Sequence, residues 1–161
     1  MKSIYWYEND KQLFQAEVLA MRKFYPSFKL MKLPDGRLYW RGKVNPLGAT
    51  VWDLMVIYDN DHPHTQPGQY GGSIDVYPVS PNLSALQKQL GSTPIPHIYY
   101  KNGGEEAYIC TVRPNEFQAS GNRSSTAASC IAWACKWICV FELWLNGDIP
   151  FEEFDTNIHK F

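Results

Sequence analysis

The chain has 161 residues, which is the size of one ordinary domain, and 45% of them are hydrophobic. Aromatic residues make up 15% and charged residues 19%, a balance that argues against intrinsic disorder. Fifteen basic and sixteen acidic side chains leave a net charge of −1, so there is no basic excess to attract nucleic acid. Because no internal repeat or low-complexity linker interrupts the sequence, residues 1–161 are interpreted as a single domain.

The first half of the chain predicts one helix followed by short strands. Apolar residues spaced three and four apart predict an amphipathic helix over residues 4–25, ended by Pro26. Proline, aspartate and glycine at 34–36 are a strong turn signal between two strands. In all, about four short strands are predicted, at residues 28–33, 37–44, 51–58 and 73–79.

The second half predicts an irregular segment that carries a cysteine and then a long helix. Residues 82–91 are interpreted as a loop or short helix, and residues 94–112 as extended pieces around a glycine turn. The apolar residues 126–145 predict a closing helix, which Asn146-Gly147 can cap. Since helices and strands are segregated along the chain, the expected fold class is α+β with an antiparallel sheet of about four strands.

The closing helix is long and apolar enough to raise the question of a membrane span. Lys136 and Glu142 lie in its interior, and each charge near a bilayer centre costs about 2.5–3.5 kcal/mol. A buried helix of a globular domain is therefore expected, with no membrane partner. At the other end of the chain, Glu8 and Asp10 precede any apolar run, so no signal peptide is expected and the predicted location is the cytoplasm.

In that compartment the four cysteines are expected to be reduced. Cys130, Cys135 and Cys139 lie in the apolar helix, where reduced cysteine is expected to behave as a small buried hydrophobe. The loop at residues 59–64 is rich in aspartate and histidine but lacks a recognised metal-ligand spacing. Neither a metal nor a cofactor is expected.

Cys110 has a different setting, because it ends a short apolar stretch that follows a Gly-Gly turn. An extended segment that leaves the fold there can expose the thiol, and an exposed thiol can act as a nucleophile through its thiolate. The alternative is a strand-end cysteine that points into the core, and spacing alone favours this alternative. A thiol protease would also need a histidine base, and no histidine of the chain lies in a family-specific signature.

Several short motifs occur in a fixed order around Cys110. They are Tyr77-Pro78-Val79-Ser80-Pro81, Pro96-His97-Ile98-Tyr99, Gly103-Gly104, Ile109-Cys110, Pro114-Asn115-Glu116-Phe117, Trp133 with Trp137, and Phe141 to Gly147. In this order they resemble the active-site region of ubiquitin-conjugating enzymes, and more closely that of their bacterial relatives, over roughly residues 10–150. Two features depart from the eukaryotic pattern. The chain has no His-Pro-Asn tripeptide, and Thr111 stands where a leucine usually follows the cysteine.

The resemblance implies a ubiquitin-conjugating-enzyme-like fold in which Cys110 is the catalytic nucleophile and accepts an acyl group as a thioester. His97 and Tyr99 would order the loop, and the backbone amides at Gly103 and Gly104 would be available as donors to an oxyanion. The bacterial relatives imply a stand-alone conjugating protein of antiphage defence. Its Cys110 would bond to the carboxyl terminus of a cGAS-like nucleotidyltransferase and regulate it. The alternative is a non-catalytic binding module of the same fold that docks a partner peptide.

A short tail, residues 148–161, follows the closing helix. Phe151, Phe154, Ile158 and Phe161 recur at intervals of three, four and three, which predicts an apolar face on a terminal helix. That face can pack on a partner protein or on the core of the domain itself, and the second is the simpler expectation.

Overall fold

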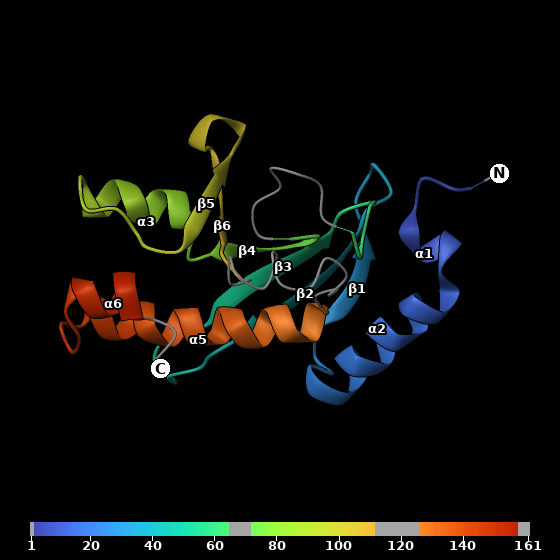
Figure 1. Cartoon of the computed structure of the whole chain (residues 1–161). Coiled ribbons are helices and arrows are strands. Elements are labelled where there is room, and N and C mark those ends of the chain that lie inside the picture. The colour runs from blue at the N-terminus through green and yellow to red at the C-terminus, as the bar shows by residue number, and fades with distance from the viewer. Residues whose placement is uncertain (1, 65–71, 112–125, 158–161) are drawn as a thin grey trace.

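The computed structural model describes residues 2–64, 72–111 and 126–157 (Figure 1). Within these ranges the chain forms helices α1 (Trp6–Asn9), α2 (Lys11–Phe24), α3 (Leu83–Leu90), α5 (Ala127–Leu145) and α6 (Phe151–Asn157), and a 3-10 helix, η1 (Asn102–Gly104). The strands are β1 (Lys29–Lys32), β2 (Leu38–Val44), β3 (Trp52–Tyr58), β4 (Ile74–Ser80), β5 (Ile98–Lys101) and β6 (Glu106–Ile109). The predicted α+β class is confirmed, with an amino-terminal helix, an antiparallel sheet and a carboxyl-terminal helix.

The strands form one antiparallel sheet in the order β1-β2-β3-β4-β6-β5. The four predicted strands are present, but the expected number of strands was wrong. The cysteine-bearing segment adds two more, which form a hairpin at one edge of the sheet. In this hairpin Ile98 pairs with Ile109 and Lys101 with Glu106, and β6 joins β4 where Val76 pairs with Ile109. Each new strand has only four residues, too few for a clear alternating pattern, so pairing with β4 rather than local sequence makes it a strand.

The predicted amino-terminal helix is broken into two. Asp10 separates α1 from α2, and its carboxylate accepts a hydrogen bond from the backbone N–H of Leu13 at 3.0 Å. Aspartate offers the backbone such an alternative partner, which favours the cap of a new helix over the interior of a continuous one. The predicted segment is therefore helical, but Asp10 interrupts it after the single turn of α1.

Helix α5 matches the predicted closing helix within one residue at its start. Thr126 and Ser129 exchange side-chain and backbone hydrogen bonds in a capping box at the amino-terminal end. At the other end Gly147 has a φ of +81°, and its N–H donates to the carbonyl of Trp144 at 3.0 Å. The Asn-Gly signal therefore ends the helix as expected.

Helix α5 lies across one face of the sheet, and α2 packs beside its amino-terminal half (Figure 1). By length and composition alone α5 could cross a membrane. In the structure the side chains of α5 that face the sheet form the core with it. The rings of Trp137 and Phe141 are stacked with their centres 4.8 Å apart, and both rings contact Trp52 of β3. The indole N–H of Trp52 donates to the carboxylate of Glu142 at 2.7 Å, so one of the two charges in this helix is used within the fold.

Candidate active site around Cys110

Cys110 lies at the open end of the β5–β6 hairpin, one residue beyond β6. Its backbone N–H donates to the carbonyl of His97, just before β5, at 2.9 Å. Two residues that are thirteen positions apart in the sequence are thus neighbours across the hairpin. Both residues belong to the sequence motifs, but it is the pairing of β5 with β6 that brings them together.

Cys110 is half-buried, and its sulfur lies 3.4 Å from the hydroxyl oxygen of Tyr99. Tyr99 pairs directly with Tyr108, and their rings lie 5.5 Å apart. Because side chains alternate along a strand, Cys110 shares the face of Tyr108, two residues before it. Tyr99, which the sequence names only as a loop-ordering residue, therefore reaches the thiol itself.

The same face of the sheet carries an ion pair between a buried aspartate and a partly exposed lysine. The ammonium of Lys101 bonds to Asp75 on β4 at 2.6 Å and lies 4.9 Å from the centre of the Tyr108 ring. Asp75 is 3% exposed, and its burial raises the pKa of the carboxyl group to about 6. Sequence reasoning missed this pair, although an aspartate inside an apolar strand is a signal that could have revealed it.

Gly103 and Gly104 lie at the opposite end of the hairpin from Cys110. They form η1 with φ values of +67° and +91°, beside the Lys101–Glu106 pair. Glu105 and the four residues of β6 separate this turn from Cys110, and β6 alone spans about 14 Å at roughly 3.4 Å per residue. The expectation that these glycines donate to an oxyanion at Cys110 is therefore corrected: they allow the tight hairpin turn instead.

The imidazole of His97 faces α6 through Nε2. This atom lies 3.1 Å from the carbonyl oxygen of Phe154 and 2.8 Å from that of Asp155. Since a carbonyl can only accept a hydrogen bond, Nε2 carries the proton and donates it. This half of the ring thus contacts the backbone of the terminal helix.

The other three cysteines lie on α5, and burial raises the pKa of each thiol. The pKa is raised to about 12 for Cys130 and to about 11 for Cys135, and that of Cys139 is raised as well. Cys130 is buried in the core, as predicted, whereas Cys135 and Cys139 are only half-buried. Since the thiolate is the reactive form, these three thiols are poor nucleophiles at neutral pH.

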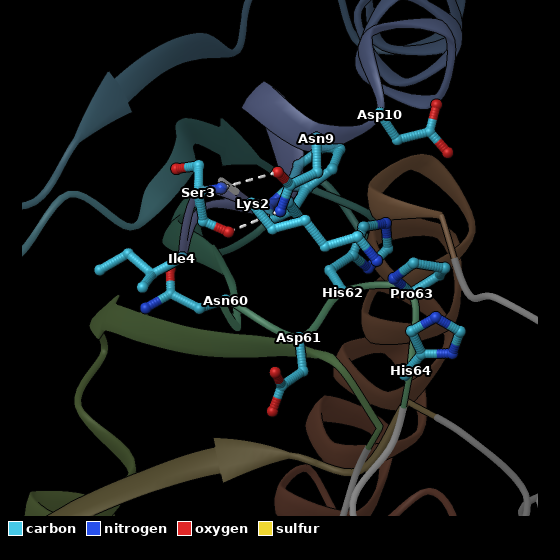
Figure 2. A pocket seen from close by; sticks show the side chains of 11 residues that line it. Lys2, Ser3, Ile4, Asn9, Asp10, Asn60, Asp61, His62, Pro63 and His64 are labelled. Carbon is cyan, nitrogen blue, oxygen red and sulfur yellow. Dashed lines mark hydrogen bonds between the residues drawn. The ribbon is translucent and has the colours of Figure 1, made fainter.

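A pocket of about 700 Å³ lies between the amino-terminal residues and the loop after β3 (Figure 2). Lys2, Ser3 and Asn9 line one side and Asn60 and His62 the other, and Cys110 is not part of it. The Nδ1 of His62 bonds to the hydroxyl of Ser73 at 2.8 Å, and burial lowers the pKa of the imidazole to about 4. Across the described ranges, no cluster of three or more histidine, cysteine or acidic side chains could hold a metal ion.

Fold and site together define an α+β protein with one thiol set apart from the core helix, at the end of an edge hairpin. The family model described as "Type II CBASS E2 protein" matches residues 17–149, and the chain belongs to this family. The matched segment contains Cys110, His97 and Tyr99 and ends before α6. No curated protein and no solved structure matched the chain. Family membership gives the protein a role in CBASS antiphage defence.

Proposed function

We propose that Cys110 forms a thioester with the carboxyl terminus of a partner protein, a cGAS-like nucleotidyltransferase of the same defence system, and so regulates that partner. The E2 designation of the family supports conjugating chemistry. Cys110 must be a free thiol to accept the acyl group, and free thiols persist in the cytoplasm, so we place this activity there.

The proposed reaction starts from a partner whose terminal carboxyl group is already activated as a thioester on a donor thiol. The Cys110 thiolate attacks the carbonyl carbon, a new C–S bond forms, and the C–S bond to the donor breaks. The donor leaves as a thiolate and takes up a proton. A later amine can accept the acyl group, forming a C–N bond and returning the Cys110 thiol. Cysteine needs no strong base for this chemistry, because a few per cent is ionised at neutral pH.

One observation carries the assignment to Cys110. Its half-buried side chain lies beside the Tyr99 hydroxyl at the end of the edge hairpin, whereas the other three cysteines lie on α5. Cys110 therefore joins partial exposure, which Cys135 and Cys139 share, to a hydroxyl neighbour that can donate to a thiolate.

The test is co-expression with the nucleotidyltransferase and the other proteins of the same defence system, so that the donor thiol is present, followed by gel electrophoresis with and without reductant. We expect a covalent adduct of the two chains that a thiol reductant or hydroxylamine removes. Cys110→Ser should give a smaller amount of an oxyester adduct that survives the reductant, and Cys110→Ala should give none. Cys139→Ser, which changes a half-buried thiol on α5, is the matched control and should behave as the wild type.

Two outcomes would overturn the proposal. One is an adduct that persists in Cys110→Ala. The other is copurification of the two chains without any adduct, together with phage protection that Cys110→Ala leaves intact. The second outcome is the behaviour of a binding module of the same fold.

A further inference from the structure

His97 has a backbone conformation that its surroundings must hold in place. Its φ is +59°, in the left-handed region, where a residue with a Cβ is disfavoured by about 1–2 kcal/mol. The preceding carbonyl, of Pro96, accepts a hydrogen bond from the indole N–H of Trp137 on α5 at 3.0 Å. The carbonyl of His97 itself accepts the N–H of Cys110. The conformation of His97 thus fixes where the backbone of Cys110 is held.

The side chain of His97 links this backbone to α6. Its Nε2–H is shared between the carbonyls of Phe154 and Asp155, which belong to the last four residues of that helix. Carbonyls at the carboxyl end of a helix have no partner within the helix, so the imidazole serves as their cap. The contact therefore depends on α6 being folded and docked.

Helix α6 packs on α5 through Phe154, which is fully buried, and through Phe151, whose ring lies 5.9 Å from that of Trp144. The ring of Phe154 is 0% exposed and lies 5.6 to 6.2 Å from the rings of Trp144, Trp137 and Phe141 on α5. Phe154 thus packs on the core of the domain, the simpler of the two expectations for the tail; Ile158 and Phe161 lie outside the described residues. A continuous series of contacts thus connects the core to Cys110: the core rings contact Phe154 of α6, α6 accepts a hydrogen bond from His97, and His97 accepts one from Cys110.

We propose that α6 positions Cys110 for thioester transfer, with His97 as the positioning residue that connects them. This inference rests on the proposed function, but its structural part can be tested without it. The family match ends at residue 149, so α6 is an element of this chain beyond the matched region. Undocking α6 should free His97 from its left-handed conformation and loosen the hydrogen bond to the Cys110 N–H.

The first test measures amide hydrogen exchange at Cys110 in the full chain. Asp155→Pro breaks α6 in its last turn, and Asp155→Ala is the matched control that keeps the helix. We expect the Cys110 amide to exchange at least tenfold faster in Asp155→Pro, with the Val56 amide in central strand β3 unchanged. Equal exchange at Cys110 in the two variants would overturn the proposal, whatever the protein does with its partner.

The second test separates positioning from binding by comparing two replacements of His97. Glutamine would place an amide N–H near the position of Nε2, whereas alanine removes the donor, and both keep a Cβ in the left-handed backbone. We expect His97→Ala to lower the maximal rate of adduct formation about tenfold with an unchanged half-saturating partner concentration. His97→Gln should restore most of that rate, and the proposal fails if the two variants are equally slow.

The two proposals fail in different ways. A wild-type protein that forms no adduct, together with phage protection that Cys110→Ala leaves intact, would contradict thioester transfer. Faster exchange of the Cys110 amide in Asp155→Pro would still support the connection through α6. Adduct formation that is normal in Asp155→Pro would contradict the positioning role and leave thioester transfer intact.

Discussion

At the scale of single residues, the contact between Cys110 and Tyr99 is the part of the site that the sequence could not supply. The isolation of Cys110 from the three cysteines of α5 is visible in the sequence, and so is the motif that contains Tyr99. That the Tyr99 hydroxyl lies 3.4 Å from the sulfur depends on the register of the β5–β6 hairpin. A shift of one residue would turn Tyr99 to the other face of the sheet.

This contact predicts the effect of Tyr99→Phe. The hydroxyl can donate to the thiolate, and a hydrogen bond of about 1 kcal/mol corresponds to about a fivefold change in rate. We expect iodoacetamide to alkylate Cys110 about fivefold more slowly in Tyr99→Phe, with an unchanged melting temperature because the ring still packs on Tyr108. Peptide mass spectrometry after timed alkylation measures this rate.

Tyr100→Phe is the control, since it removes a hydroxyl from the neighbouring residue, which bonds to Gln87 instead. Its alkylation rate should equal that of the wild type. If Tyr99→Phe also reacts at the wild-type rate, the hydroxyl has no part in the reactivity of Cys110.

At the scale of elements, Glu17 joins α2, the sheet and α5. Its carboxylate accepts hydrogen bonds from the hydroxyl of Tyr58 on β3 at 2.6 Å and from the N–H of Ala127 at 3.0 Å. Ala127 is the first residue of α5, where backbone N–H groups have no partner within the helix. Burial raises the pKa of Glu17, although both hydrogen bonds favour the ionised form. The amphipathic pattern of α2 predicts its helix, but this polar contact with a residue 110 positions away is not encoded locally.

These two hydrogen bonds predict that Glu17→Ala lowers the free energy of unfolding by about 3 kcal/mol, because the substitution leaves two buried donors without their acceptor. Glu17→Gln keeps an acceptor oxygen and should cost only about 1–2 kcal/mol. Urea denaturation followed by tryptophan fluorescence measures both. Glu8→Gln, at an exposed position on α1, should lie within about 0.5 kcal/mol of the wild type. Wild-type stability of Glu17→Ala would show that the contact has no structural role.

At the scale of the whole molecule, His62 connects the amino-terminal region to the sheet. Its ring lies 4.6 Å from that of Trp6 on α1 and 5.0 Å from that of Tyr58, and it bonds to Ser73 next to β4. The ring is 3% exposed, and burial lowers its pKa from 6.5 to about 4. The folded state therefore holds this histidine neutral over a pH range in which the unfolded chain binds a proton.

The lowered pKa predicts how stability depends on pH. Between pH 6.5 and 4 the unfolded state binds more protons than the folded state, so stability falls as the pH falls through this window. The loss attributable to His62 is about 3 kcal/mol, from about 1.4 kcal/mol for each unit of pKa difference. His62→Gln keeps a polar partner for Ser73 and should remove this loss, as measured by urea denaturation at pH 7 and pH 4.5. His64→Gln, on the exposed rim of the pocket, should retain it; an equal acid loss in His62→Gln would contradict the assignment.

The sequence by itself determined the α+β class, the first four strands, the position and both ends of α5, and the separate placement of Cys110. These features depend on residues that are close together in the chain: apolar periodicity, caps and turn signals act within a few positions. Only the tertiary structure decided that the cysteine-bearing segment is a hairpin, that Gly103 and Gly104 lie away from the thiol, and that His97 joins Cys110 to α6. Those arrangements depend on strand register and on hydrogen bonds between distant segments, which a short four-residue strand cannot specify through its own sequence.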